Sequence, residues 1–308
     1  MRFFVAVTDD AWFDFLRQLA PDEVNFWRPS GREFSSIEIG SLLLFKLHSP
    51  LNCIVGGGFF VRSEKLPLSL AWEVFEQKNG AANQSQFERL IRHHRGYDEP
   101  DPEIGCIILN QPFFIPREHW IPAPGDWKPA IQTGKTYDDK ETCGKRLWES
   151  VAPWIPGFEP AEAGNTIAVA GQELPRLYGN EYLHRSRLGQ GAFRILVTDA
   201  YQRRCAVSGE RTLPVLQASH IKPYGNGPNR IDNGLLLRSD LHILFDRGYM
   251  TVTPELRVEI SQRIKEEYEN GRDYYKLHGS PLVVLPLASI DRPNKDFLRW
   301  HNEKVFRA

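Results

Sequence analysis

The feature that most constrains the fold is a pair of histidines, His220 and His242, set around a loop and a second apolar run. The runs CAVSG at 205–209 and TLPVLQASHI predict two short strands, and IDNGLLLR follows a loop. SDLHILFD then predicts a helix that begins at Ser239 or Asp240. The order from 205 onward should therefore be strand, turn, strand and helix, with one histidine near a strand end and one on the helix.

His242 and Asp246 are four positions apart, so one face of the expected helix presents both side chains. Ligands from a helix and a nearby strand end would leave open positions on a metal ion, as catalysis requires. Two alternatives are buried structural histidines and a zinc finger. The four cysteines form no CxxC pair, and none lies at finger spacing from either histidine, which disfavours the zinc finger.

The blocks SHI, DNG and LHILFDRGY occur in the order found in HNH nucleases, the ββα-metal family, and this region resembles that family. The resemblance implies phosphodiester hydrolysis with one divalent ion, Mg²⁺ or Mn²⁺. It makes His220 the general base, Asn233 a brace that holds the loop by hydrogen bonds, and His242 a metal ligand. An imidazole suits a general base near neutral pH. Relatives with a structural zinc carry two CxxC pairs, so no structural zinc is expected here.

The expected set of metal ligands departs from the family pattern at one position. Many relatives place Asp or His directly before the base, whereas this chain has Ser219 there, which is a weak ligand. Asp246 is the replacement candidate, and its alternative role is to hold Arg247 or the helix. The ligand candidates are therefore His242, Asp246 and Ser219.

The charge of the chain is unevenly distributed. The net charge is −1, but residues 184–250 hold ten Lys or Arg against five Asp or Glu. A local basic patch is what phosphate binding requires, and guanidinium groups bind phosphates through two hydrogen bonds. A solvated helix face is the alternative for these arginines. The candidates for DNA phosphate contacts are Arg185, Arg187, Arg194, Arg203 and Arg204.

The N-terminal part of the chain has a different pattern, in which short strands alternate with helices. Strands are expected at 2–7, 41–47, 53–62 and 104–109, and helices at 9–19, 70–77 and 84–94. At 308 residues, two domains are the default expectation. The fold class is α+β: a curved β-barrel at 1–135, a helical connector and linker at 136–183, and a ββα-metal domain with flanking helices at 184–308.

Residues 1–135 resemble the EVE branch of the PUA-like fold through NFWRPSGREF, LLLFKL, IVGGGFF, LPLSLAWEVF and DPEIGC followed by QPFF. The resemblance implies a reader that takes a modified base out of its stack and encloses it between aromatic walls. Aromatic faces replace lost stacking, and polar groups read the base edge. Aromatic residues in a β-barrel are more often core, and this alternative applies to all five aromatics considered, of which about two would line a pocket: Trp27, Phe34, Phe59, Phe60 and Trp72. The base-binding candidates are Trp27, Ser35, Ser36, Asn52, Phe59 and Trp72.

These patterns together predict a modification-dependent DNA endonuclease. Its expected partner is double-stranded DNA with 5-methyl- or 5-hydroxymethylcytosine, and its expected role is defence against foreign DNA. One site cuts one strand, so a double-strand break needs a homodimer or two successive nicks. The alternatives are an HNH nuclease directed at unmodified sequence or structure, and a modified-RNA binding module with a degenerate nuclease half. No apolar run is long enough for a membrane span, and a reducing cytoplasm is the expected location.

Overall fold

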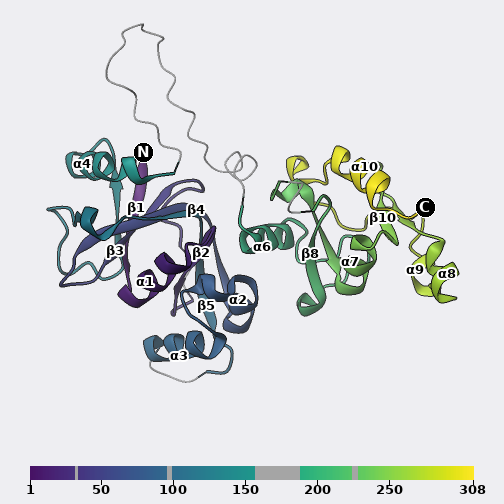
Figure 1. The fold of residues 1–308 in the computed structure, drawn as a ribbon, viewed down its shortest axis with the longest axis horizontal. Helices are drawn as coiled ribbons and strands as arrows, with labels where there is room; N and C mark the ends of the chain where they lie inside the picture. The colour runs from purple at the N-terminus through teal and green to yellow at the C-terminus, as the bar shows by residue number, and fades with distance from the viewer. Residues whose placement is uncertain (32–33, 96–98, 157–187, 224–227) are drawn as a thin grey trace, which may run out of the picture. The chain divides into compact units, whose positions relative to one another are not determined.

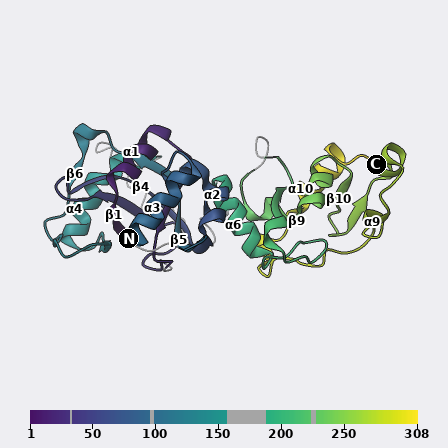
Figure 2. The same ribbon diagram turned by 90° about the horizontal axis from the view of Figure 1, so that it is seen from below.

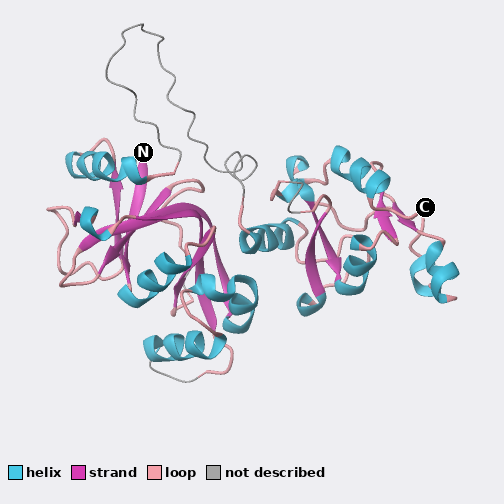
Figure 3. Ribbon diagram, viewed as in Figure 1, coloured by secondary structure: helices cyan, strands magenta, loops and turns pink. Residues whose placement is uncertain are grey.

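The computed structural model describes the chain outside residues 32–33, 96–98, 157–187 and 224–227. The chain divides into two compact units, Met1–Arg185 and Ser186–Ala308. Each unit mixes strands and helices (Figure 3), so the expected α+β class is confirmed.

The first unit is built on one large, mostly antiparallel sheet (Figure 1). Its strands follow the order β2-β5-β4-β3-β1-β7, with β6 on β4, and only the pair β1 and β3 is parallel among those paired in the described chain. The expected barrel is therefore an open path here, with β2 and β7 at its ends. The strands are β1 (Arg2–Thr8), β2 (Glu23–Arg28), β3 (Leu42–Leu47), β4 (Cys53–Pro67), β5 (Glu103–Phe114), β6 (Ile121–Pro122) and β7 (Gly134–Asp138).

Side-chain alternation along β1 gives the sheet two buried faces. Phe4 and Ala6 belong to one apolar cluster, and Phe3 and Val5 belong to another. The first cluster contains residues of α1, whose N-terminus is capped by Asp9, and the second contains residues of α4. The helices are α1 (Asp10–Leu19), α2 (Leu68–Phe75), α3 (Gln84–Arg95) and α4 (Thr142–Val151), with short 3-10 turns η1 (Glu76–Asn79), η2 (Arg117–His119) and η3 (Ala152–Trp154).

Strand β4 bends strongly, because its pairing with β5 shifts register twice, between Gly57 and Phe59 and between Phe60 and Arg62. The glycines at this bend serve the sheet itself. A Cβ on Gly56 would lie 2.3 Å from the carbonyl oxygen of Phe113 on the neighbouring strand. The glycine run thus permits close approach of strand to strand.

The first unit extends beyond the end at residue 135 that was predicted for the reader domain. Two further elements, β7 and α4, complete this unit. Strand β7 pairs with β1 from Arg2↔Asp138 to Ala6↔Gly134. Leu147 and Val151 of the predicted connector helix, α4, are buried in the same cluster as Phe3. The rest of the predicted linker lies outside the described residues.

The second unit begins with α6 (Gln190–Ala200) and continues through the antiparallel hairpin of β8 (Leu216–His220) and β9 (Gly234–Arg238). The helix predicted at Ser239 is confirmed as α7 (Ser239–Asp246). The strand predicted at 205–209 is wrong: the segment is a turn, in which Gly209 N–H donates to Cys205 O over 2.9 Å. The remaining elements are η4 (Leu213–Val215), η5 (Ile231–Asn233), β10 (Met250–Val252), β11 (Val258–Ile260), α8 (Arg263–Tyr268), α9 (Arg272–Tyr275), η6 (Ser289–Asp291) and α10 (Lys295–Lys304).

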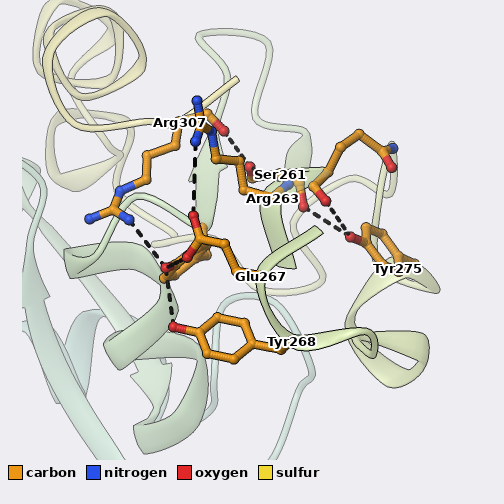
Figure 4. A network of polar contacts seen from close by, with 8 residues as sticks. Ser261, Arg263, Glu267, Tyr268, Tyr275 and Arg307 are labelled. Atoms are coloured by element: carbon orange, nitrogen blue, oxygen red, sulfur yellow. Dashed lines mark hydrogen bonds and ion pairs between the residues drawn. The ribbon is translucent and has the colours of Figure 1, made fainter. Parts of the chain in front are cut away.

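A polar network fastens the end of the chain to α8 (Figure 4). The Tyr249 hydroxyl donates to Glu267 and lies 3.2 Å from the Tyr268 hydroxyl. Arg307 donates from Nη1 to the Tyr249 hydroxyl over 3.1 Å and stacks its guanidinium on the same ring. Ser261 Oγ donates to the Arg307 carbonyl. These contacts hold the segment after α10 in place beside β10 and β11.

In the described part of the chain, no helix has the length and apolar character needed to cross a membrane.

Candidate active site

The site is built on the β8–β9 hairpin, which contacts α6 and α7 (Figures 1 and 2). His220 is the last residue of β8 and pairs with Gly234, the glycine of the DNG block. A Cβ on Gly234 would lie 2.5 Å from Val197 Cγ2 and 3.0 Å from Phe193 Cζ. Only glycine therefore lets α6 pack this closely on the strand that pairs with His220.

The His220 ring is held on one face and at one nitrogen. It stacks on Phe193 of α6, with ring centroids 3.9 Å apart and planes 10° apart. Its Nε2 hydrogen-bonds the side-chain oxygen of Asn229. Burial lowers the pKa of His220 below its usual value of 6.5, against the opposing effects of the Asn229 hydrogen bond and of Asp246. A neutral imidazole at pH 7 is the form that can accept a proton.

The side chain of Asn233 is hydrogen-bonded to the backbone of the loop that follows His220. Its Oδ1 accepts from Lys222 N–H over 2.9 Å, and its Nδ2 donates to the carbonyls of Lys222 and Pro228, each over 2.9 Å. The fully buried Asn233 thus ties together the two ends of the loop that follows His220. This geometry fits the loop-bracing role expected for it.

His242 and Asp246 face each other on one side of α7, with Nε2 and Oδ2 3.2 Å apart. Adjacent oxygen or nitrogen ligands of an octahedral Mg²⁺ or Mn²⁺ lie about 3 Å apart, so this pair fits one divalent ion. His242 Nδ1 lies 2.8 Å from Gln217 Oε1 on β8. An amide oxygen only accepts, so Nδ1 carries the hydrogen and Nε2 keeps the lone pair that a metal needs.

Ser219 precedes His220 on β8, and alternation points it to the same side of the strand as Gln217. Its side chain is fully buried, and its Oγ has no hydrogen-bond partner in the described residues. No group of three or more His, Cys, Asp or Glu suited to a metal occurs in the described chain. Ser219 therefore stays a candidate third ligand, and water would complete the shell.

His301 of α10 packs against α7, the helix that carries His242 and Asp246. His301 is 2% exposed, stacks on Phe245 with centroids 3.8 Å apart, and donates from Nε2 to the Phe245 carbonyl over 3.1 Å. Thr251 Oγ1 lies 2.8 Å from the other ring nitrogen. Burial lowers the pKa of His301 to about 4, so this ring is neutral in the folded protein.

The structure describes three of the five arginines expected to contact phosphates. Arg194 lies on α6, one position after Phe193, and Arg203 and Arg204 lie in the turn after α6, where Arg203 is exposed and Arg204 half-buried. Arg185 and Arg187 lie outside the described residues. Arg194 thus belongs to the helix that packs against His220, and Arg203 and Arg204 belong to the turn directly after it.

Two of the six base-binding candidates come together in the first unit. Trp27 on β2 and Trp72 on α2 both contact the ring of Phe87 on α3, with centroid distances of 5.8 Å and 6.0 Å. The Trp27 indole donates from Nε1 to the carbonyl of Asn79 over 2.8 Å. The ring centroid of His94 lies 5.8 Å from that of Trp27. The two tryptophans are half-buried, so each keeps part of its surface in solvent.

The other four candidates lie elsewhere in the first unit. Ser35 and Ser36 are exposed in the connection between β2 and β3. Asn52 turns the chain between β3 and β4 and accepts from Lys46 Nζ over 2.8 Å. Phe59 packs against the cluster that contains α4. A hollow of about 210 Å³ has none of the six among its lining residues, which are Leu68, Ser69, Glu88, Arg92, Asp101 and Pro102.

Three residues of the site were missed by the sequence analysis: Phe193, Asn229 and Gln217. Phe193 and Asn229 hold His220, and Gln217 holds His242. Gln217 stands three positions before His220 on the same strand. Because this strand packs against the helix that carries His242, this position was the available signal for a contact with His242. Asn229 lies in an irregular segment, where periodicity gives no signal.

The hairpin of β8 and β9 and the helix α7 place one histidine at a strand end and a second on the helix. Residues 205–253 match the family model for HNH endonucleases. The chain therefore carries an HNH endonuclease domain and is a nuclease enzyme. The matched segment excludes α6, which contributes Phe193 to the site. No curated protein matches the chain.

Solved structures with a similar fold fall into two groups. ASCH from Zymomonas mobilis is 12% identical with a TM-score of 0.34, over 47% of this chain and 94% of that one. A variant of the same protein is 10% identical with a TM-score of 0.35, over 48% and 97%. The modification-dependent restriction endonuclease TagI is 15% identical with a TM-score of 0.29, over 86% of this chain and 61% of that one.

Proposed function

We propose that the chain is a modification-dependent DNA endonuclease that flips a modified cytosine, 5-methyl- or 5-hydroxymethylcytosine, into its first unit and cleaves with its second. The first unit takes the role of a PUA-like reader of the EVE type. The observation that carries the proposal is the pairing of a neutral, held His220 with a His242–Asp246 pair on the neighbouring helix. Defence against foreign DNA is the biological role that such an enzyme serves.

In the proposed reaction, His220 takes a proton from water while the water oxygen bonds to phosphorus. The bond from phosphorus to the leaving oxygen then breaks, and that oxygen takes a proton from solvent. His242 and Asp246 would hold a divalent ion, which would supply charge stabilisation for the reacting phosphate and the leaving oxygen. Arg194, Arg203 and Arg204 position the backbone phosphates.

The reader half of the proposal is supported by the half-buried Trp27 and Trp72 around Phe87. Flipping a base costs a few kcal/mol, and stacking on an aromatic side chain returns about 1–3 kcal/mol per base. The second candidate function is an HNH nuclease directed at unmodified sequence or structure. It is favoured because four of the base-binding candidates do not lie with the two tryptophans: Ser35, Ser36, Asn52 and Phe59.

Digestion of matched plasmids tests the proposal. Copies of one plasmid carrying cytosine, 5-methylcytosine or 5-hydroxymethylcytosine are incubated with the full chain and Mg²⁺ or Mn²⁺, with a chelator control. Cleavage restricted to a modified copy is the expected result. Equal cleavage of all copies would move the second candidate to first place, and metal-independent cleavage would remove the ion from the mechanism.

A further inference from the structure

The fully buried amide of Asn229 lies between His220 and the start of the second unit. Its Oδ1 is hydrogen-bonded to His220 Nε2, and its Nδ2 donates to the carbonyl of Leu188 over 2.6 Å. A carbonyl oxygen cannot donate, so the amide nitrogen must face Leu188 and the amide oxygen must face the histidine. The orientation of the Asn229 amide is therefore fixed by its backbone partner.

This orientation also determines where the hydrogen on the neutral imidazole lies. The amide oxygen of Asn229 only accepts, so His220 Nε2 must be the donor and must carry the hydrogen. The lone pair of the neutral ring is then on Nδ1. Phe193 holds the plane of the same ring by stacking, so the ring is fixed in both orientation and tautomer.

We propose that Asn229 is a positioning residue that holds His220 in the Nε2–H tautomer and makes Nδ1 the nitrogen that accepts the proton from water. The inference rests on the proposed function, because it concerns the base of the same reaction. When Nδ1 takes the proton, both nitrogens of the ring carry hydrogen, and the bond to Asn229 is kept. Asn229 thus holds the ring before and after the transfer, while the water O–H bond breaks and the Nδ1–H bond forms.

The alternative role for Asn229 is purely structural, as a link between the loop before β9 and the chain at Leu188. The two roles separate in two variants. Asn229→Ala removes both contacts. Asn229→Asp keeps an oxygen that accepts from His220 Nε2 but removes the donor to Leu188. A structural role would make the two variants equally poor, whereas a positioning role makes Asn229→Asp the better enzyme.

The tautomer is measured directly by long-range ¹H–¹⁵N correlation spectra of the full chain with ¹⁵N-labelled histidine, without added metal. The His220 signals are assigned by their loss in His220→Ala. We expect a protonated Nε2 and an unprotonated Nδ1 in the wild type and in Asn229→Asp, and a mixture in Asn229→Ala. Circular dichroism checks the fold of each variant, and Asn270→Ala, an exposed asparagine of the same unit, is the matched control.

Cleavage kinetics supply the second readout. For Asn229→Ala we expect kcat to fall about 10–100-fold, as for other residues that orient a site histidine, with KM nearly unchanged. A hydrogen on Nδ1 in the wild type would overturn the inference, as would an unchanged tautomer in folded Asn229→Ala. If the wild type cleaves no DNA, the proposed function fails, but the spectra still decide the role of Asn229.

Discussion

His242 of α7 donates from Nδ1 to Gln217 Oε1 of β8 over 2.8 Å, and this contact joins the helix that carries His242 and Asp246 to the strand that ends in His220. The donor on Nδ1 leaves the lone pair of Nε2 on the side of Asp246, whose Oδ2 lies 3.2 Å away. A single amide therefore sets both the tautomer of His242 and the direction of its Nε2 lone pair.

Replacing Gln217 is expected to weaken metal binding while leaving the fold intact, because Gln217 is exposed and its loss frees the His242 ring to turn. Gln217→Ala should raise the dissociation constant for Mn²⁺ by about 10–100-fold, measured by isothermal titration calorimetry. Gln202→Ala is the matched control, since that exposed glutamine donates to the carbonyls of Ala200 and Leu285, away from His242. Equal affinities for wild type and Gln217→Ala would contradict the orienting role.

Removing the base should abolish cleavage without weakening DNA binding. His220→Ala is expected to lower the cleavage rate by about 10²–10⁴-fold, the usual contribution of a general base. Binding is measured by fluorescence anisotropy with a labelled duplex and Ca²⁺ in place of the activating ion. His278→Ala is the control, because His278 is an exposed histidine that accepts from Ile260 N–H, away from the hairpin. Wild-type rates in folded His220→Ala would end the assignment.

The two ligand candidates on α7 should both affect the metal requirement. His242→Ala is expected to raise the Mn²⁺ concentration at half-maximal cleavage, and Asp246→Ala should raise it by the same or a smaller factor. The Asp246 side chain is 58% exposed, so its loss leaves no cavity. A Mn²⁺ titration of cleavage by each variant measures the effect, and an unchanged midpoint removes that residue from the ligand set.

Acid should destabilise the second unit through His301. Burial lowers the folded-state pKa of His301 to about 4, below its ordinary 6.5, so the unfolded chain binds the proton more readily between these values. The contribution of His301 to the free energy of unfolding is fully present above pH 6.5. As the pH falls toward 4, up to about 3 kcal/mol of it is lost. Calorimetric unfolding of the wild type and of His301→Gln at several pH values measures it. Parallel pH dependence in the two proteins would exclude His301 as the cause.

The sequence predicts local features of the site well, because they depend on residues close together. The i, i+4 pair of His242 and Asp246 follows from helix geometry, and the helix start at Ser239 follows from the apolar pattern after it. The contact of Asn229 with Leu188 spans 41 positions and joins two irregular segments. No periodic pattern encodes such a contact, so only the folded chain reveals it.

The limit of the first unit escapes sequence reasoning for a related reason. β7 is a short edge strand whose residues, Gly134–Asp138, are partly polar, and its pairing with β1 depends on register across more than a hundred residues. The pattern at 2–7 predicts a strand but cannot show which segment will pair with it. The helix α4 was predicted, whereas its packing against Phe3 and Val5 was not.

The last prediction concerns Trp27 and follows from the proposal that the first unit reads the base while the second unit cleaves. Its indole is partly committed to the scaffold through Asn79, and its ring forms a cluster with Phe87 and His94. If a flipped cytosine stacks here, Trp27→Ala should remove the preference for modified DNA and keep the nuclease chemistry. Trp27→Phe should keep part of the preference, because it restores an aromatic face without the Nε1 donor.

Binding of matched modified and unmodified duplexes at two salt concentrations tests this in the full chain, with His220→Ala as the background so that the DNA stays intact. The difference between the duplexes should persist at high salt, because stacking releases few counterions, whereas the contribution of the arginines around α6 should fall steeply. Trp154→Ala is the matched control, a half-buried tryptophan that packs on the α4 cluster. If Trp27→Ala and Trp154→Ala bind both duplexes as the parent does, Trp27 is not part of the reader. If the parent itself binds both duplexes equally, an enzyme directed at unmodified DNA becomes the better description.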